Sequence, residues 1–558
     1  MLTESNSPPF GRAGAMPTTA AGLSVDLRRF SWLSRLGADY LHDFDRLARF
    51  YNGNPADPAA WRDAIARAQR HPRQREAVAD VIAAQQRRRN APPSAVSALE
   101  QLRDPQTVAV VTGQQAGLFG GPLYTLLKTI TAVRLAARVR EQYRVPAVAV
   151  FWADGEDHDW EEVRSCTVLD AEAGSRSVAL PAAPHSTVPV GRVTLDTTID
   201  AALADLKASL PPTEFTPRLL DDLARLYRPG VSMTAAFAAW IEALLGPHGL
   251  VVYESSDPGT KPLVAELYAR EIEMGGASAR RAIDAGAALQ SAGYHAQVTP
   301  AEGSLALFRM LEGREPIRVE NGTAVIGDTR QPLAELAARA RTAPHEFSSN
   351  VLLRPLVQDT LFPTVAYVGG PGETAYFAQM KEIYAAHGVP MPLIAPRPTV
   401  TLLDANAVKF LTRHDVPLES LRAQDESVLN DLLAAALPPA VEASLESAMK
   451  AMDERLAAVT SAVSSVDPTL EGAARSTLTR MQDDLKKLQA KVIQAAKRKD
   501  ETLRRQFKHA QAQAFPGGAP QERVVGFVSF LNKYGPALIE RLCQEPPLDQ
   551  PGHWIVTP

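Results

Sequence analysis

A dense group of acidic side chains lies in the segment ADGEDHDWEE, residues 153–162. Crowding like charges is unfavourable unless a cation, a basic partner or shared protons compensate. Carboxylate oxygens suit Mg²⁺ and through it a phosphate-bearing substrate, whereas a histidine beside carboxylates could act as a general acid or base or bind a substrate amine. The alternative is a solvated acidic helix start, because acidic residues favour the first turn. The candidate catalytic residues are Asp154, Glu156, Asp157, His158 and Asp159.

The glycine-rich segment TGQQAGLFGGPLY, residues 112–124, is the second candidate site. Its glycines let a ligand approach the backbone, and free N–H groups at the start of a following helix favour an anion such as phosphate or carboxylate. The segment matches neither GxGxxG nor the Walker A pattern, so it carries no nucleotide fingerprint. A tight strand-to-helix turn with glycines for packing is the alternative. The candidate binding residues here are Thr112, Gly113, Gln114, Gln115, Gly117 and Tyr124.

Two adjoining segments, residues 347–364 and 365–381, place further polar residues in apolar surroundings. Arg354 and Gln358 are four residues apart and would share one helix face, and an arginine suits bidentate recognition of carboxylate or phosphate. A buried structural Arg–Asp pair is the alternative. The second segment reads as strand, glycine turn and helix again, and two such turns in one sheet indicate a crevice between them. The candidate binding residues are Asn350, Arg354, Gln358, Asp359, Gly369, Gly370, Gly372, Glu373 and Tyr376, with Tyr294 and His295 of GYHAQV as weaker ones.

Buried parallel strands must position these residues. Continuous apolar, β-branched runs predict strands at 107–113, 145–155, 249–257, 363–370 and 392–403. The first two strands are joined by a glycine turn and a helix at 123–143, which predicts a βαβ unit and a parallel, Rossmann-like α/β core. Further helices are expected within 25–90 and at 216–247, 258–290 and 373–387. Ligands of such sheets lie beyond the carboxyl ends of the strands, where the candidate residues fall.

Two stretches interrupt this core pattern. Residues 163–197 and 294–328 alternate short apolar segments with turns, which is typical of small antiparallel β insertions. The ENG sequence at 320–322 predicts a hairpin turn. We therefore expect a core of residues 23–404 with two inserted subdomains at about 160–215 and 258–345.

A heptad pattern begins after the core. Apolar residues recur at spacings of three and four from Val441 to Val463 and again from Leu478 to Val492, with Asp467-Pro468 between the runs. The pattern predicts an antiparallel coiled-coil hairpin within an α-helical region at 405–520, followed by a C-terminal helix and tail at 521–558. An ordinary helical pair packed on the core is the alternative. The charged outer faces of the helices favour a protruding or dimerising hairpin.

Composition excludes several classes of protein. The chain has 558 residues, 45% of them hydrophobic and 22% charged, and its formal charge of −4 gives no nucleic-acid footprint. Its two cysteines cannot form a disulfide framework or a four-cysteine zinc site, so we expect a reducing cytoplasm. Residues 1–22 lack an apolar signal sequence and predict a disordered leader, within which Met16 is an alternative start. The charge-free stretch 105–127 contains glutamines, glycines and prolines and predicts no membrane span.

Six motifs carry a resemblance to a known family. They are TGQQAGLFGGPLYTLLKTI at 112–130, VFWADGEDHDWEEV at 150–163, GYHAQV at 293–298, NVLLRPLVQDTLFPTVAYVGGPGETAYFAQMK at 350–381, PMPLIAPR at 390–397 and QERVVGFVSFLNKYGP at 521–536. Together they resemble the BshC family of bacillithiol-biosynthesis cysteine ligases, in order over residues 23–558. The resemblance implies a Rossmann-like core with two connecting insertions and a coiled coil used for dimerisation.

The resemblance also implies a function. The family is expected to add L-cysteine to glucosamine-malate, which completes the low-molecular-weight thiol bacillithiol through a new carbon–nitrogen bond. Amide formation from a free carboxylate needs activation, which ATP could supply through an acyl-adenylate or an acyl-phosphate. We therefore expect ATP or ADP as the cofactor, Mg²⁺ as a further candidate, and a cytoplasmic homodimer that binds these small molecules and neither nucleic acid nor membrane. No catalytic residue is carried over from the family.

Two other classes of function stay open. One is a different nucleotide-dependent or metal-dependent transferase that uses the same crevice. The other is a noncatalytic dimeric scaffold with a Rossmann-like core. The density of polar residues at the strand ends argues against the scaffold.

Overall fold

The chain folds into two compact units. The computed structural model describes residues 18–19, 22–182, 188–435, 439–499 and 501–558. One unit contains the described residues between 18 and 402 together with 520–556, and the other contains those between 403 and 519. The second unit is therefore inserted into the first along the chain.

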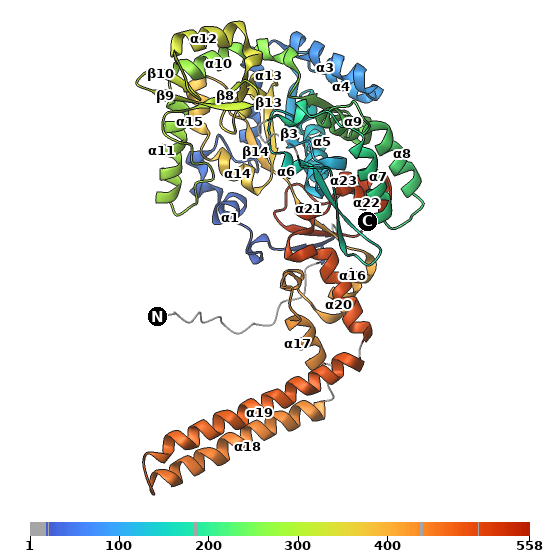
Figure 1. Cartoon of the computed structure of the whole chain (residues 1–558), viewed down its shortest axis with the longest axis vertical. Coiled ribbons are helices and arrows are strands. Elements are labelled where there is room, and N and C mark those ends of the chain that lie inside the picture. Colours follow the sequence, from blue (N-terminus) through green and yellow to red (C-terminus); the bar gives the residue numbers. More distant parts are fainter. Residues whose placement is uncertain (1–17, 20–21, 183–187, 436–438, 500) are drawn as a thin grey trace. The chain divides into compact units, whose positions relative to one another are not determined.

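A five-stranded parallel sheet forms the centre of the larger unit (Figure 1). Its strands, in spatial order, are β14 (Leu393–Pro396), β13 (Thr364–Gly369), β3 (Val108–Gln115), β4 (Ala147–Asp154) and β7 (Leu250–Glu254). Alternate residues of β3 belong to two hydrophobic cores, Val108 and Val110 to one and Ala109 and Val111 to the other. A strand buried on both faces has no polar side, which explains its continuous apolar sequence. The predicted Rossmann-like parallel core is confirmed.

Helices cover both faces of this sheet. The predicted helix at 123–143 is present as α5 (Leu123–Tyr143) and packs on β3 and β4. The other predicted helices are also broken. Those at 216–247 and 258–290 break where glycine or proline intervenes, because neither residue supports continuous helix, whereas the one at 373–387 breaks at a turn over residues 378–380 that contains neither. The resulting helices are α8 (Thr216–Leu226), α9 (Met233–Leu245), α10 (Ala265–Glu273), α11 (Ala277–Ser291), α14 (Pro371–Phe377) and α15 (Lys381–His387). The N-terminal helices are α1 (Arg35–His42), α2 (Pro58–Arg70), α3 (Arg75–Arg89) and α4 (Pro93–Gln101).

The predicted strand at 392–403 is wrong as a single element. It divides into β14 of the central sheet and β15 (Thr399–Leu402) of a second, four-stranded sheet. Pro398 separates the two, and a residue without an N–H group cannot continue a strand ladder. The order in the second sheet is β1 (Thr18–Thr19), β2 (Gly22–Val25), β16 (His553–Val556) and β15.

This second sheet includes both ends of the described chain. Strand β16 pairs parallel with β15 and antiparallel with β2. Of the expected leader at residues 1–22, Thr18, Thr19 and Gly22 therefore belong to strands, and the rest lies outside the described residues. The C-terminal segment reaches this sheet through α21 (Gln521–Val524), α22 (Phe527–Tyr534) and α23 (Ala537–Gln544).

Both expected insertions contain antiparallel β structure. The first has α6 (Trp160–Val163), a two-stranded ribbon of β5 (Ser165–Leu169) and β6 (Ser175–Ala179), and α7 (Thr198–Ser209). The second is a sheet in the order β11 (Thr329–Pro332), β10 (Thr323–Ile326), β9 (Arg314–Glu320), β8 (Ser304–Met310) and β12 (Phe347–Ser349), with α12 (Leu333–Thr342). Asn321 and Gly322 join β9 to β10 with φ of 50° and 76°, the two-residue turn expected of this hairpin. Helix α13 (Arg354–Leu361) follows β12 and leads into β13.

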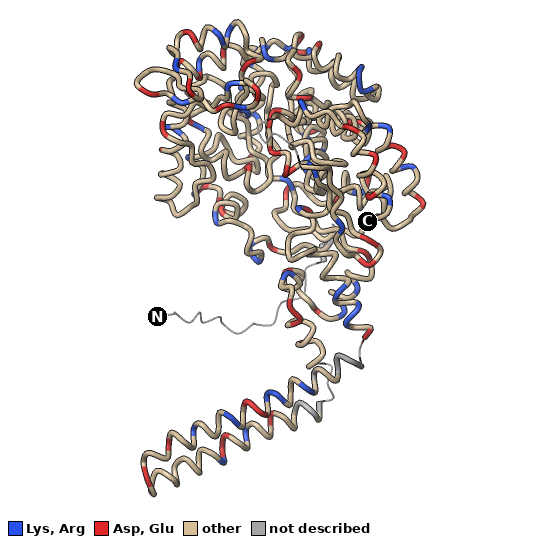
Figure 2. Tube along the Cα trace, in the orientation of Figure 1, with Lys and Arg blue, Asp and Glu red and all other residues tan. Residues whose placement is uncertain are grey.

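The inserted unit contains the predicted coiled-coil hairpin. Its helices are α16 (Ala405–His414), α17 (Ser427–Ala435), α18 (Pro439–Ser464), α19 (Leu470–Lys499) and α20 (Glu501–Ala514). Helices α18 and α19 lie side by side, and Figure 2 shows charges of both signs along them. The seam residues stay partly accessible, with Val459 46% and Leu488 50% exposed. None of the described helices is long and apolar enough to cross a membrane.

Candidate functional site

A cavity of about 790 Å³ opens at the carboxyl ends of β3, β4 and β13. Loops that follow these strands line one side of it, and the β8–β9 hairpin with residues 349–352 lines the other. The sequence-predicted residues that it brings together are Gly113, Gln114, Gln115, Tyr124, Asp154, Glu156, Asp157, His158, Asn350, Arg354, Gly370, Gly372, Glu373 and Tyr376. The cavity lies entirely within the larger unit, so the inserted unit contributes no lining residue.

The glycines after β3 are required by close packing. A Cβ on Gly113 would lie 2.9 Å from the Trp152 side chain, and one on Gly120 would lie 2.1 Å from the Phe527 ring. Gly120 also has φ of 103°, which only glycine adopts readily. Gly117, which faces the Gly121 backbone, does not line the cavity. This turn therefore fits the packing alternative better than an anion cradle.

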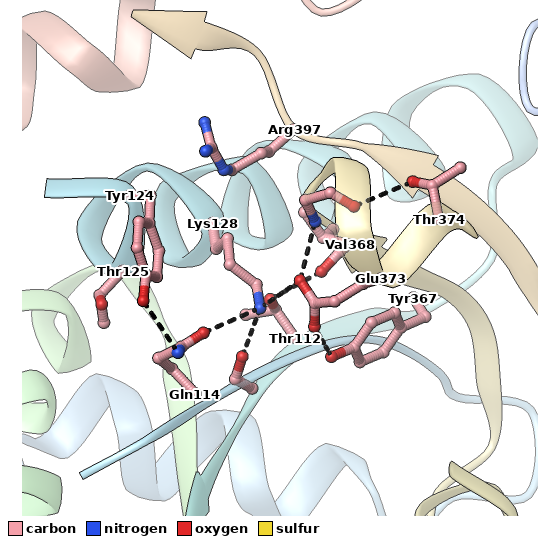
Figure 3. A network of polar contacts seen from close by, with 12 residues as sticks. Thr112, Gln114, Tyr124, Thr125, Lys128, Tyr367, Val368, Glu373, Thr374 and Arg397 are labelled. Carbon is pink, nitrogen blue, oxygen red and sulfur yellow. Dashed lines mark hydrogen bonds and ion pairs between the residues drawn. The ribbon is translucent and has the colours of Figure 1, made fainter. Parts of the chain in front are cut away.

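A buried lysine connects the two glycine turns. Lys128, 1% exposed, donates from Nζ to the Gly113 carbonyl at 2.5 Å and to Oε1 of Gln114 at 3.3 Å. Its third partner is Oε2 of Glu373 at 2.7 Å (Figure 3). Burial lowers the pKa of Lys128, an effect that the neighbouring carboxylate opposes. The ion pair thereby holds β3 against the turn that follows β13.

Glu373 is held by three groups at once. Besides Lys128, Oε1 accepts the Tyr367 hydroxyl at 2.5 Å and Oε2 accepts the Gly370 N–H at 2.8 Å. Burial alone would raise the pKa of Glu373, but Lys128 and the Gly370 N–H bring it below its usual range. Glu373 is therefore an ionised residue that orients the Gly370 turn.

The carboxylates of the acidic loop are paired with groups from distant segments. Glu156 forms an ion pair with Lys261 and accepts the Ser348 hydroxyl at 3.1 Å. Asp157 accepts Nε2 of Gln115 at 2.5 Å and Nη1 of Arg314 at 3.1 Å. These contacts explain how the loop tolerates its crowded negative charges, because basic and amide partners compensate them.

Asp154 and His158 keep a free side toward the cavity. Both hydrogen bonds that described residues give to the Asp154 carboxylate end on Oδ1, from the Glu156 N–H at 3.1 Å and the Ser255 hydroxyl at 3.3 Å. Burial raises the pKa of Asp154, and Arg354 nearby lowers it by less. His158 is 39% exposed, with Nδ1 3.4 Å from Asp157 Oδ1. Asp154 is thus the acidic-loop residue best suited to exchange a proton with a bound ligand.

Asp159 of the acidic loop has a structural role and caps a helix. Its Oδ1 accepts the Glu162 N–H at 3.1 Å and caps α6, and it does not line the cavity. This is the helix-start role that the sequence offered as the alternative for the acidic loop. No group of three or more His, Cys, Asp or Glu side chains that could hold a metal ion occurs in the described part of the chain. The donor set therefore does not fit a metal held by the protein alone.

Arg354 is a half-buried cation that lines the cavity and has no acidic partner among the described residues. Its guanidinium lies 5.8 Å from the Trp152 ring centroid and 5.7 Å from that of Tyr367. Its hydrogen bonds go to Gln358 Oε1 at 3.2 Å and the Tyr376 hydroxyl at 3.4 Å, and it forms no ion pair with a described residue. Such a planar cation between aromatic rings is suited to bind a carboxylate or phosphate.

Several predicted binding residues lie elsewhere. Gln358 and Asp359 are fully buried behind the cavity and bond to each other at 2.8 Å. Tyr294 donates to Asp39 at 2.7 Å on another part of the unit, and His295 is exposed beside it. The remaining residues outside the cavity lining are Thr112, Gly117, Asp159 and Gly369.

These placements have physical reasons. Gln358 lies one helical turn from Arg354 and bonds to it but is fully buried, and the next residue, Asp359, points into the core, where it accepts the Tyr384 hydroxyl. Thr112 points across the sheet, where its hydroxyl donates to the Val368 carbonyl at 2.9 Å. Position at a strand end is therefore not enough to place a side chain in the site.

Sequence reasoning missed part of the lining. The missed residues with polar or aromatic side chains include Lys128, Trp152, Arg314, Arg318, Tyr367, Arg397 and Arg523. Two of them had a signal in the sequence, since Lys128 follows the glycine turn and Trp152 ends a strand. Arg523 lies in the motif at 521–536 but was not singled out, and Arg314 had no signal, because it is 157 residues away from Asp157, which it meets.

Two family models together match nearly the whole chain. Residues 23–398 match the family model described as "Bacillithiol biosynthesis BshC, N-terminal Rossmann-like domain". Residues 400–558 match the one described as "Bacillithiol biosynthesis BshC, C-terminal coiled-coil domain". The boundary between the two matches differs from the structural division, in which residues 520–556 belong to the Rossmann-like unit.

Relatives named "Putative cysteine ligase BshC" are similar over most of the chain. The protein from Salinibacter ruber is 36% identical over 524 residues, covering 93% of this chain and 96% of the relative. The protein from Chlorobaculum tepidum is 33% identical, with 84% and 86% covered. The protein from Bacillus velezensis is 30% identical, with 92% and 96% covered.

Proposed function

The chain belongs to the bacillithiol biosynthesis BshC family, and we propose that it is a ligase that joins L-cysteine to glucosamine-malate to form bacillithiol. The names of its relatives support the reaction class. The observation that carries the proposal for this site is Arg354, a cation at the cavity without an acidic partner among the described residues. Both substrates carry carboxylates, so a free guanidinium is the group that they require.

The reaction forms one carbon–nitrogen bond. The glucosamine nitrogen attacks the activated carboxyl carbon of cysteine, the activating group leaves with its oxygen, and the nitrogen loses a proton. ATP would supply the activation when bound, and the guanidinium group of Arg354 suits a phosphate or a substrate carboxylate. Mg²⁺ would then be held mainly by those phosphates, because the described carboxylates of the loop already have protein partners.

We assign to Asp154 the role of the base that takes the proton from the attacking nitrogen. Its Oδ2 has no hydrogen bond from a described residue, and its raised pKa makes it a better base than an ordinary exposed aspartate. Gln115 and Arg314 hold Asp157 of the same loop by hydrogen bonds. Arg354 lines the same cavity as Asp154, and we assign it to hold the anionic substrate there.

Reconstitution tests the proposed reaction. Purified full-length protein is given glucosamine-malate, L-cysteine and ATP with Mg²⁺, and products are measured by mass spectrometry together with ATP consumption. We expect bacillithiol in proportion to the ATP consumed. If neither bacillithiol nor ATP consumption is found over a range of conditions, the ligase proposal fails.

A matched pair of substitutions tests the proton assignment. Asp154→Asn removes the base but keeps the size of the side chain, and we expect kcat to fall at least about 100-fold. Asp159→Asn, five residues along the same loop, keeps a good helix cap and should leave kcat within about twofold. Equal activity of the two variants would rule out Asp154 as the base.

We also propose that the hairpin of α18 and α19 makes the protein a homodimer. Its seam residues are only partly covered within one chain, as the exposure of Val459 and Leu488 indicates. Light scattering of the full chain should give twice the chain mass, and deletion of residues 440–499 should give a monomer. A full chain that is already monomeric would refute the dimer.

A further inference from the structure

The C-terminal segment is built into the wall of the cavity. The Gln521 side chain accepts the Leu402 N–H and donates to the Leu402 carbonyl, both at 2.8 Å. Farther along, the Leu123 N–H donates to the Val525 carbonyl at 2.8 Å. The segment is therefore bonded on one side to β15 and on the other to the start of α5, directly beside the glycine turn.

Glu522 of this segment forms an ion pair with Arg397, which lines the cavity. Its two carboxylate oxygens accept Nη1 and Nη2 of Arg397 at 2.8 and 2.7 Å, and the two side chains are 6% and 2% exposed. Glu522 Oε2 also accepts the Val400 N–H at 2.9 Å. Burial opposes the charge of Glu522, but Arg397 lowers its pKa below the usual range. The pair is ionised and fixed in orientation, as bidentate geometry requires.

Arg397 retains a donor that Glu522 does not satisfy. Its Nε is buried and has no hydrogen-bond partner among the described residues, although the residue lines the cavity. The backbone N–H of Arg397 donates to the Gly369 carbonyl at 3.0 Å, and a Cβ on Gly370 would lie 3.9 Å from Nε. The unsatisfied donor thus lies beside the Gly370 turn, where an uncompensated N–H is unfavourable unless a ligand accepts it.

A second arginine lines the cavity near Arg397, and we call this part of the cavity wall the corner. Arg523, the residue after Glu522, is exposed, lines the cavity and forms no ion pair with a described residue. The Arg397 guanidinium lies 5.7 Å from the ring centroid of Tyr124, which also lines the cavity. The corner therefore offers positive charge and N–H donors, the combination that binds an anionic oxygen group.

We propose that Arg397 and Arg523 form a second anion subsite of the cavity and that Glu522 is the positioning residue that holds Arg397 in it. The ligand group is a carboxylate or a phosphate. The inference rests on the proposed function, in which a dicarboxylate and a nucleotide both reach the cavity and need more than the one cation, Arg354. It assigns a binding role to residues 520–556 that their match to a coiled-coil domain does not suggest.

Direct binding to the full-length protein tests the subsite without needing turnover. L-Malate and inorganic phosphate are titrated separately by calorimetry at constant ionic strength, because salt would screen the charges. Arg523→Gln should weaken one of the two probes about tenfold, the loss of one charge-assisted contact. Arg541→Gln on α23 is the matched control, since this exposed arginine lies in the same segment outside the cavity, 3.3 Å from Glu545.

The probe that loses affinity identifies the ligand group. Weakened malate binding assigns the subsite to a carboxylate, and weakened phosphate binding assigns it to a phosphate. The proposal is overturned if the wild type binds neither probe, if Arg523→Gln binds both like the wild type, or if Arg541→Gln loses as much. A protein that fails the ligase assay but shows the Arg523 effect refutes the reaction and keeps the subsite.

A separate variant tests whether Glu522 positions Arg397. Glu522→Gln keeps the shape of the side chain but removes its charge, so Arg397 should lose its orientation. We expect the same probe to weaken at least fivefold and, in the ligase assay, KM to rise while kcat stays within twofold. A fall in kcat with KM unchanged, or unchanged binding, would refute the positioning role. If this variant does not fold, Arg523→Gln alone decides the subsite.

Discussion

The acidic loop after β4 and Arg354 of the same cavity differ in how their charges are balanced. In the loop, Glu156 pairs with Lys261 and Asp157 with Arg314. Among the arginines, Arg354 meets only neutral and aromatic partners at hydrogen-bond and stacking distances. The loop is the more conspicuous feature of the sequence, but its charge is largely used within the protein.

This difference changes what the cavity is suited to bind. Paired carboxylates attract little additional cation, whereas an unpaired guanidinium favours an anion strongly. The site is therefore better suited to carboxylate and phosphate groups than to a free metal ion. The comparison also shows that an acidic cluster in a sequence must be assessed with its partners, which come from other segments.

The largest effect is expected from breaking a pair in the loop. Lys261 and Glu156 are 9% and 15% exposed, so Lys261→Met leaves a poorly solvated carboxylate without its cation. We expect a loss of about 3–5 kcal/mol in the free energy of unfolding, measured by urea denaturation. The double variant with Glu156→Gln should recover part of the loss, because the uncompensated charge is gone.

Lys381→Met is the control for this prediction. Among the described residues the ammonium of Lys381 donates to the Arg49 carbonyl alone, at 3.0 Å near the surface, and its loss should change the unfolding free energy by about 0.5 kcal/mol or less. If Lys261→Met is equally mild, the loop does not depend on its internal cation.

Two buried carboxylates extend this contrast, because Glu522 forms an ion pair and Asp359 forms none with a described residue. Glu522 faces Arg397 and has a lowered pKa, whereas burial raises the pKa of Asp359 to about 6 from 3.8 despite hydrogen bonds from Gln358 and Tyr384. With a raised pKa the folded state holds the Asp359 proton more tightly than the unfolded state. Its contribution to stability is complete below about pH 4 and is lost as the pH rises through 6.

Asp359→Asn tests this sign. The wild type should lose about 3 kcal/mol from this group between pH 4 and pH 7, and the variant should lack that part of the slope. The unfolding free energy of both proteins is measured by denaturant titration at each pH. If the two curves of unfolding free energy against pH are parallel, Asp359 is ionised at every pH measured, and its buried hydrogen bonds are enough to stabilise that charge.

The third prediction concerns Arg354, and its expected effect in kcal/mol is similar to or smaller than that of Asp359. Arg354→Gln should lower kcat/KM about 100-fold, or about 2.7 kcal/mol, because a charge-assisted contact to the substrate is lost. Its thermal unfolding should stay close to that of the wild type, since Arg354 forms no ion pair with a described residue. Arg280→Gln, on an exposed face of α11, is the control and should keep full activity. Full activity of Arg354→Gln would move the anion site elsewhere in the cavity.

Most of the core could be predicted from local sequence. The strands of the parallel sheet are recognisable because burial on both faces demands continuous apolar residues, as in residues 107–113. The heptad pattern similarly indicated α18 and α19. The division of 392–403 between two sheets was missed, because it is marked only by the short segment Pro396-Arg397-Pro398 and the apolar run continues beyond.

The candidate site was predicted in part. Residues that directly follow strands, such as Asp154 and Glu373, reach the cavity because parallel strands end at one edge of the sheet. Asp359 and Thr112 failed to reach it because helix phase and strand pleat point them into the core. His295 failed because its segment packs on another part of the unit.

The class of the core, its strand-end loops and the hairpin follow from local sequence, because each depends on the periodicity of neighbouring residues. Which charges are paired depends on the three-dimensional fold. Lys261, Arg314 and Glu522 lie 105, 157 and 125 residues from Glu156, Asp157 and Arg397. Contacts at such separations follow from how the insertions and the C-terminal segment return to the sheet, and no local pattern records them.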